Sequence, residues 1–318
     1  MTARLNLALV AATILIQLFM SAGGAQAGSA YDSKVRPPAF TEFGNPETVQ
    51  ILGYNDNEGN SNDAMEPFIS RGGNLMLFNS SNAAATTNLF WATRIDDVTF
   101  QYQGEIGGEV NSSGPLDAVA SMDSNGAFYF ITNRSYGSIG APGYLSTIYS
   151  GTFAGGIVTP VNPVPGVAAP KPGLVDFDEE ISADGNTLYF TQGNFATGNL
   201  TSTTMMVATR QGGHFVVDPN SAKIMKTINH QDLNYAADTS ADELEFFFTR
   251  TNLKAGPAIY VATRKSTSKP FGKPKKIDAI TGFAEAPSIS PDDLSLYYHV
   301  KNPSGVFMIN RVTRTMKP

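Results

Sequence analysis

Carboxylates recur at corresponding places along this chain, each close to the start of a strand-like run. They are Glu66, Asp117, Asp176, Asp178, Glu179 and Glu285. If the fold brings these places together, the carboxylates have three possible uses. They can accept backbone N–H groups of neighbouring strands, bind a cation, or act as the acid and the base or nucleophile of a hydrolytic reaction.

The last two uses predict particular residues. Oxygen ligands without Cys favour Ca²⁺ over Zn²⁺. The candidate calcium ligands are Glu66, Asp117, Asp178 and Glu285. Cleavage of a glycoside needs two carboxyl groups at a defined separation, and the candidate pairs are Asp63 with Glu66 and Asp178 with Glu285.

No other catalytic signature is specific. The chain has three His residues and no Cys. His230, two residues before Asp232, is a candidate base, and the alternative is a solvated turn residue. The sequence contains neither a G-x-S-x-G elbow nor a P-loop, so it does not define a reaction.

Aromatic and amide side chains in the nearby loops could form a binding surface. The candidates are Tyr136, Tyr144, Asn194, Phe195, Tyr235 and Phe283. We expect the rings to be exposed and to suit a sugar or a peptide. The alternative is that some of them pack between neighbouring sheets.

Five repeats must position these residues. Each has an acidic start, a small polar turn, an aromatic strand, an Asn, and a second strand that often ends in Ala-Thr-Arg. The aromatic strands end at Phe78, Phe130, Phe190, Phe248 and Tyr298. Repetition with a period of about 50–60 residues is typical of propeller blades. We therefore predict an all-β, five-bladed β-propeller of four-stranded antiparallel blades, in which the acidic starts and the Asn loops share one face.

The ring is expected to close through the N-terminus. Four repeats are followed by an outer strand, but the fifth ends at Pro318 without one. The segment 40–52 reads as an outer strand with no blade before it. Pairing this segment with the last repeat completes the fifth blade and removes exposed sheet edges.

The repeat resembles that of the TolB-type family of WD-like β-propellers. The matching runs are Ser182 to Phe190, its variant Ser290 to Tyr298, and the strand Ile259 to Arg264. The resemblance covers Asp63 to Arg314, with no counterpart of the separate N-terminal domain of TolB. It implies the propeller fold and a habit of binding partners, but no assured activity.

The N-terminus predicts export. Residues 1–27 have a basic residue, an apolar run and an Ala-Gln-Ala cleavage pattern, as in a secretory signal peptide. We expect 28–40 to be a flexible segment and 41–318 to be one propeller domain. The mature protein would be periplasmic or secreted, without a membrane span. It would be a monomer, because a closed ring has no free sheet edge.

Charge and motifs together favour recognition over catalysis. The net charge of −6 argues against nucleic acid as a partner. A lysine-rich run between 265 and 276 reads as a solvated edge, with a binding patch as the alternative. The leading hypothesis is a non-enzymatic scaffold that binds an envelope or extracellular protein, peptide or glycan. The alternative is a carbohydrate-active or other hydrolase that uses the mouth carboxylates, with or without Ca²⁺.

Overall fold

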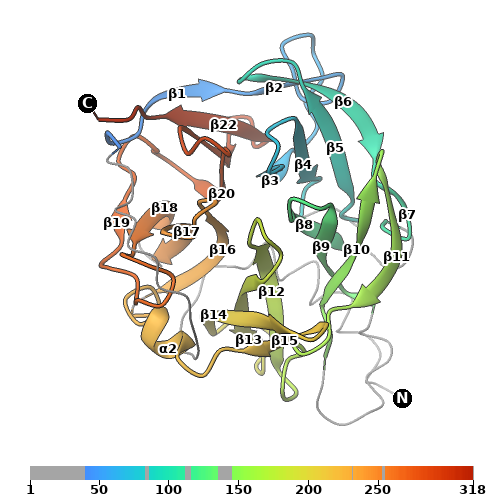
Figure 1. Ribbon diagram of the computed structural model, residues 1–318. Helices are drawn as coiled ribbons and strands as arrows, with labels where there is room; N and C mark the ends of the chain where they lie inside the picture. Colours follow the sequence, from blue (N-terminus) through green and yellow to red (C-terminus); the bar gives the residue numbers. More distant parts are fainter. Residues whose placement is uncertain are drawn as a thin grey trace.

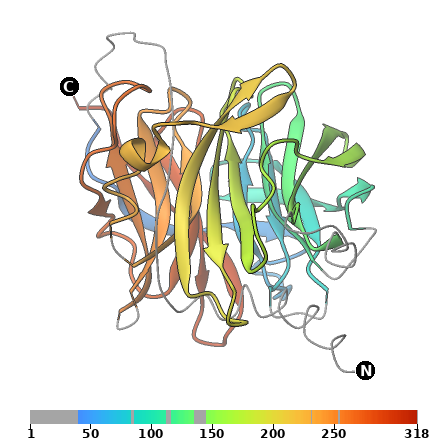
Figure 2. The same ribbon diagram turned by 90° about the horizontal axis from the view of Figure 1, so that it is seen from below.

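Five β-sheets stand around one axis in the computed structural model, which describes residues 40–82, 86–111, 116–134, 145–230, 232–252 and 255–317. Figure 1 looks down this axis, and Figure 2 shows the same ring from the side. The prediction of a five-bladed β-propeller is confirmed. The predicted signal peptide and nearly all of the segment 28–40 lie outside the described residues.

The blades follow one another along the chain. From the axis outward, blade 1 contains β3 (Met65–Ile69), β4 (Leu75–Asn79), β5 (Leu89–Arg94), β6 (Thr99–Glu105) and β2 (Gln50–Leu52). In the same direction, blade 2 contains β8 (Asp117–Met122), β9 (Ala127–Thr132), β10 (Ile148–Ala154), β11 (Ile157–Pro163) and β7 (Gly107–Gly108). Blade 3 contains β12 (Leu174–Ile181), β13 (Thr187–Asn194), β14 (Ser202–Gln211) and β15 (His214–Val217).

The last two blades complete the ring. Blade 4 contains β16 (Leu233–Thr239), β17 (Glu245–Asn252), β18 (Gly256–Thr263) and β19 (Lys275–Lys276). Blade 5 contains β20 (Ala284–Ile289), β21 (Ser295–Lys301), β22 (Phe307–Thr313) and β1 (Gly44–Thr48). The short helix α2 (Ser221–Ile224) lies between blades 3 and 4 in the sequence. No helix within the described ranges is long and apolar enough to cross a membrane.

The N-terminal strand closes the ring, as the sequence predicts. β1 pairs with β22 in antiparallel fashion, with Thr48 opposite Asn310. The next residue, Val49, donates its N–H to the carbonyl of Ile309 at 2.9 Å. The chain then enters blade 1, where β2 pairs in parallel with β6. One short segment therefore belongs to two blades and fastens the first to the last.

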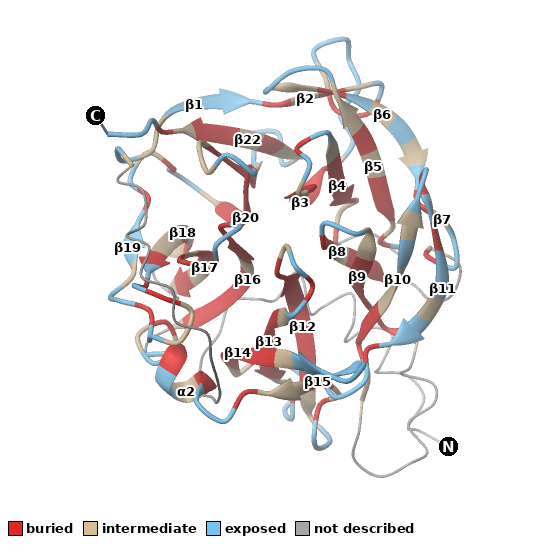
Figure 3. Cartoon of the chain, viewed as in Figure 1, coloured by how far each residue is buried: buried red, intermediate tan, exposed pale blue. Residues whose placement is uncertain are grey.

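Two features of the outer strands were not predicted. Blades 1 and 2 have five strands, because β2 and β7 add to β6 and β11 in parallel fashion. The outer strand of blade 4, β19, has only two residues in the ladder. Figure 3 shows that buried residues gather on the inner strands, whereas the outer strands are largely exposed. The five predicted strand-end aromatics are all buried, none more than 2% exposed.

The repeated Ser-x-Asp turn and the Ala-Thr-Arg ending support one another. In blade 3, the hydroxyl of Ser182 donates to Asp184 at 2.7 Å. Arg210 donates from Nε to the carbonyl of Gly185 in the same turn and from Nη2 to the hydroxyl of Tyr129 in blade 2. The turn carbonyl of its own blade is bound in the same way by Arg94, Arg264 and Arg314. The arginine thus fixes its own turn and, in blade 3, links it to the preceding blade.

Candidate functional site

Every innermost strand carries a β-bulge at the same place. The pairing of each of these strands with its neighbour shifts register there. One residue of each bulge has a positive φ: Glu66 (52°), Val119 (48°), Asp178 (51°), Ala236 (47°) and Ala286 (51°). A left-handed backbone costs a residue with a Cβ about 1–2 kcal/mol, so the surrounding contacts must hold it.

Those contacts come from the preceding blade. In four of the five bulges, a side chain of that blade accepts the N–H of the positive-φ residue. The acceptors are His299 Nδ1 for Glu66 (3.0 Å), Asn79 for Val119 (3.1 Å), Asp178 for Ala236 (3.0 Å) and Thr249 for Ala286 (2.9 Å). Polar side chains around the channel therefore join each of these blades to the next.

Glu66 and Glu285 meet at the mouth of the channel. His299 links them, because its Nδ1 accepts the N–H of Glu66 while its Nε2 lies 3.2 Å from Glu285. Because Nδ1 accepts a hydrogen bond, the neutral imidazole carries its proton on Nε2, and this N–H donates a hydrogen bond to Glu285. Tyr235 also donates to Glu285, and Asn82 donates to Glu66 at 3.0 Å.

Several carboxyl oxygens at this mouth have no hydrogen-bond partner among the residues that the structure describes. They are Glu66 Oε2, Asp178 Oδ1 and both side-chain oxygens of Glu179. Burial, the largest cause, and neighbouring carboxylates raise the pKa of Asp178 and Glu179 well above their ordinary values. Burial also raises the pKa of Glu66. A buried carboxylate without a partner is costly, so the neutral acid is favoured here.

The channel behind the mouth is narrow. Its inner walls come from all five innermost strands and enclose about 30 Å³, which is room for roughly one or two water molecules. Glu66 and Glu179 are among the lining residues. The predicted catalytic pair, Asp178 and Glu285, is at most 7% exposed. A cavity of this size does not admit a sugar ring.

Arg71 blocks the opposite end of the channel. It extends from the turn between β3 and β4 of blade 1 across to blades 3 and 4, where it binds Glu180 and lies 3.5 Å from Asp238. Ser121 donates to Glu180 at 2.6 Å. Burial raises the pKa of Glu180 to about 8, although the Arg71 charge opposes the shift.

The predicted metal ligands do not form one group. Asp117 instead binds Arg134 at 2.7 Å and accepts the N–H of Asn111 at 2.7 Å. Asp63, the proposed partner of Glu66, accepts the N–H of Phe307 at 2.8 Å. Within the part of the chain that the structure describes, no three His, Cys, Asp or Glu residues are placed to hold a metal ion. Calcium binding therefore stays a prediction.

Buried acids predict that stability falls as the pH rises. Asp176 is 1% exposed, and burial raises its pKa to about 7, so the folded state keeps a proton that the unfolded chain releases near pH 4. This contribution is complete below about pH 4 and is lost as the pH rises to about 7. We expect urea unfolding to show about 1–3 kcal/mol more stability from this group at pH 5 than at pH 7.5.

The Asp176→Asn variant should have a smaller dependence on pH than the wild type. Asp184→Asn is the matched control, because hydrogen bonds lower the pKa of Asp184 and it is ionised in both states throughout this range. If the free energy of unfolding changed equally with pH in the wild type and in Asp176→Asn, Asp176 would not keep its proton in the folded state.

The candidate ligand-binding residues differ in exposure. The expectation that Phe195 and Tyr235 are exposed was wrong: they are 7% and 2% exposed, because Phe195 packs on Phe177 and the Tyr235 hydroxyl binds Thr251 and Glu285. The half-buried Asn194 accepts the N–H of Ala196 at 3.0 Å and so caps its own turn. Tyr136 and Tyr144 lie outside the described residues.

Phe283 lines a cavity between blades 4 and 5. The cavity has a volume of about 400 Å³, and its walls include Arg250, Asn252, Tyr260 and Lys276. It opens where β17 leads into β18 and where the chain enters β20, which is the face predicted for binding. Sequence reasoning missed Arg250 and Tyr260. We name this cavity the inter-blade groove.

A second cavity adjoins the inter-blade groove. It measures about 390 Å³ and is lined by Thr227, His230, Arg250, Lys273 and Pro274. His230 is exposed, but Asp232 accepts a hydrogen bond from Asn252, and no bond joins His230 to Asp232 in the described chain. The expected pairing of a base with its carboxylate is not formed. Arg250 lines both cavities and marks their junction.

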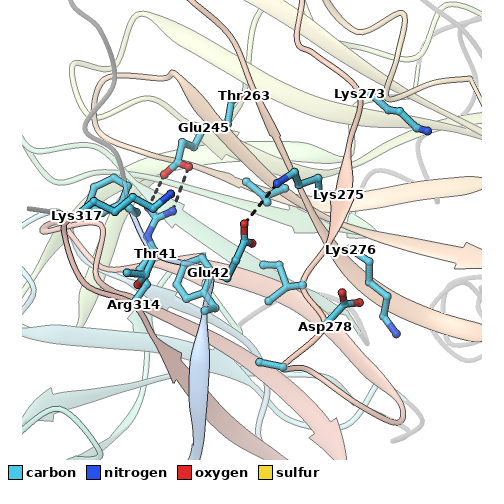
Figure 4. Close-up of a pocket in the computed structure, with 15 residues that line it drawn as sticks. Thr41, Glu42, Glu245, Thr263, Lys273, Lys275, Lys276, Asp278, Arg314 and Lys317 are labelled. Carbon is cyan, nitrogen blue, oxygen red and sulfur yellow. Dashed lines mark hydrogen bonds and ion pairs between the residues drawn. The ribbon is translucent and has the colours of Figure 1, made fainter.

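A third, larger cavity of about 770 Å³ lies between blade 4 and the residues Phe40 to Phe43, Arg314 and Lys317 (Figure 4). Four of its eight charged lining residues form ion pairs. Arg314 binds Glu245 and stacks over Phe40, and Lys275 lies 3.4 Å from Glu42. Because its central cation is already neutralised, this cavity is a weaker candidate for a charged ligand than the inter-blade groove.

Comparison with known proteins places the chain by fold alone. No family model and no curated protein sequence matches it. A solved structure described as a glycoside hydrolase is similar over 87% of this chain and 93% of its own, with a TM-score of 0.56 and 11% identity. An alpha-L-arabinofuranosidase from Podospora anserina, in complex with cellotriose, covers 87% and 98%, with a TM-score of 0.52 and 10% identity.

A TolB structure from Acinetobacter baumannii is also among the matches. It covers 80% of this chain and 55% of its own, with a TM-score of 0.43 and 12% identity. The matches with TM-scores above 0.5 show a shared architecture, and at such identities they show the fold alone. The class that the fold defines is therefore that of five-bladed β-propellers, and the TolB-type resemblance stays a prediction.

Proposed function

We propose that this chain is an exported recognition propeller of the TolB-type, that it works as a monomer, and that it binds a ligand in the inter-blade groove. One observation carries the proposal. The groove offers about 400 Å³ on the predicted binding face, whereas the carboxylate-lined channel offers about 30 Å³. Small-molecule sites in proteins have volumes of roughly 300–1,000 Å³. The groove is within that range, and the channel is far below it.

The walls of the inter-blade groove suit recognition. Phe283 is half-buried, with its ring centroid 5.9 Å from that of Phe307. Asn252 is fixed by its bond to Asp232. Rings and amides held in this way supply contact area and hydrogen bonds with little loss of side-chain entropy. We infer an envelope or extracellular ligand, and prefer a glycan to a protein or peptide.

A hydrolase is the second candidate. Its support is the presence of Glu66 and Asp178 beside Glu285, because the pKa values of Glu66 and Asp178 are raised and a carboxyl with a raised pKa suits a general acid. Structures described as glycoside hydrolases share the architecture, at 11–12% identity. A Ca²⁺ ion at these carboxylates is part of this candidate. The narrow channel counts against it. Release of nitrophenol from aryl glycosides, abolished by Glu285→Gln, would establish this function instead.

Substitution of Phe283 tests the recognition proposal. We expect Phe283→Ala to weaken retention by the binding polysaccharide about tenfold, as for loss of an aromatic anchor. Affinity electrophoresis through gels that contain defined polysaccharides measures this change. Ile157→Ala, which removes an apolar side chain 51% exposed on blade 2, should leave retention unchanged. Unchanged retention of a folded Phe283→Ala protein would exclude the groove.

A further inference from the structure

Arg250 is held rigidly at the junction of the inter-blade groove and its neighbouring cavity. Its Nε donates to Asn234 at 2.7 Å, and its Nη2 donates to the carbonyl of Ile228 at 2.8 Å. The guanidinium stacks over Phe248 and Tyr260, at 5.3 and 5.0 Å from the ring centroids. Two hydrogen bonds and two rings therefore fix its orientation before any ligand arrives.

One nitrogen of this guanidinium is left for a ligand. Nη1 of Arg250 makes no hydrogen bond to any residue of the described chain. Arg250 is half-buried, and this burial lowers its pKa. Asp232 lies close enough to oppose this shift, but its carboxylate is bound to Asn252. An oriented and partly desolvated cation of this kind favours an anionic ligand.

The charged side chains that line the two cavities are all basic, and Asp232, although near Arg250, lines neither cavity. Lys276 lines the inter-blade groove and Lys273 lines the neighbouring cavity, and neither forms an ion pair within the described ranges. No Asp or Glu is among the described residues that line either cavity. In Figure 4, Lys273 and Lys276 extend away from Glu42, whereas Lys275 reaches toward it. The chain as a whole carries a net charge of −6, so this basic junction is a local exception.

The shape of the junction favours a sugar over a peptide. An extended peptide can bind by adding a strand to a free sheet edge, where main-chain hydrogen bonds supply affinity. The outer edge of β18 is already occupied: β19 pairs with it, Ile277 donates to the carbonyl of Ile259, and Gly272 donates to that of Thr263. Two bounded cavities of about 400 and 390 Å³ remain, each wide enough for a sugar ring. The Phe283 ring and the Asn252 amide suit such a ring.

We propose that the inter-blade groove binds an anionic sugar whose carboxylate or sulfate is held by Arg250. Lys273 and Lys276 attract the same ligand from either side. The inference rests on the proposed recognition function, and it adds the chemistry of the ligand. Because the attraction is electrostatic, affinity should fall as salt increases.

Calorimetric titration of the full mature protein tests this proposal. The probes are trigalacturonate and its methyl ester, and a sulfated carrageenan tetrasaccharide and its desulfated form. We expect at least one anionic member to bind about tenfold or more tightly than its neutral counterpart, and more weakly at 0.5 M than at 0.05 M salt. A preference within the trigalacturonate pair would identify carboxylate as the recognised group, and a preference within the carrageenan pair would identify sulfate.

Variants locate the contact. Arg250→Gln should reduce the affinity for the preferred anionic probe to that for the neutral one. Lys276→Gln and Lys273→Gln alter exposed side chains and should each weaken binding about two- to fivefold, because exposed charges contribute modestly. Lys275→Gln is the matched control on the same segment, and its affinity should stay within about twofold because Lys275 faces Glu42.

Each of the remaining outcomes would disprove a particular component of the anionic-sugar proposal. Equal affinity for anionic and neutral sugars would remove the role of Arg250 and leave the groove as a sugar site. Binding of hexaglutamate in place of every sugar, lost in Lys276→Gln, would replace the sugar with an acidic peptide. If no probe binds, the anionic-sugar inference is wrong, whereas the recognition proposal is judged separately by the Phe283→Ala test.

Discussion

Replacing Arg71 with methionine should lower the free energy of unfolding by about 3–5 kcal/mol at pH 8. Its side chain is 9% exposed, and those of Glu180 and Asp238 are 1% and 3% exposed. Removing one member of such a buried group leaves the others without compensation, and Arg71 also donates to the carbonyl of Ile181. Urea unfolding followed by circular dichroism measures the loss.

The loss should depend on pH with a definite sign. With Arg71 present, the pKa of Glu180 is already about 8, and without the arginine it rises further because the opposing charge is gone. At pH 6 Glu180 is protonated, so the variant should lose less stability at pH 6 than at pH 9. The fully neutral variant with Arg71→Met, Glu180→Gln and Asp238→Asn should recover much of the loss.

An exposed ion pair supplies the control. Lys275 and Glu42 have side chains that are 72% and 85% exposed, so Lys275→Met should change stability by less than about 0.5 kcal/mol. If Arg71→Met changed the free energy of unfolding as little as this control at every pH, the buried charges in the channel would not stabilise the fold.

Deleting residues 1–52 should lower the melting temperature by more than about 10 °C. The deletion removes β1 and β2 together with Val49, which is 1% exposed. It leaves the edge of β22 unpaired and opens the junction between the first and last blades. Differential scanning calorimetry and light scattering should show a broad, early transition with aggregation.

A deletion of residues 1–39 is the matched control and should melt like the mature protein. A synthetic peptide of residues 40–52 should restore the transition of the shorter protein in a concentration-dependent way, because the peptide binds only the folded ring. If the protein without 1–52 melts as the control does, ring closure by β1 contributes little.

The fold could be predicted because its signals are local and repeated. Each strand carries its own aromatic and turn residues, and the strand-like segment 40–52 could be matched to the fifth repeat, whose outer strand it supplies. The additions β2 and β7 have only three and two residues. Such short pieces have no periodic pattern, and parallel pairing to a distant strand leaves no mark in the sequence.

The site could be predicted only in part. The repeat placed Glu66, Asp178 and Glu285 together, since equivalent positions of a ring converge. Their burial was not foreseen, because it depends on how closely all five innermost strands approach one another around the channel, and no single repeat records that distance. Arg250 was missed as an ordinary strand residue. Alignment of the repeats could have identified it, because Arg250 occupies the position that Gln192 occupies in blade 3.

The joining of the two chain ends has a consequence for biosynthesis. Asn45 and Thr313, which touch in the closed ring, are separated by 268 residues. During synthesis β1 emerges first and must wait for β22, while blades 2 to 4 contain all their own strands and can form as they appear. Contacts of such long range form late and slowly. A nascent chain that stops before β22 never gains its closing pair, so completion of the ring reports that synthesis has passed all five blades.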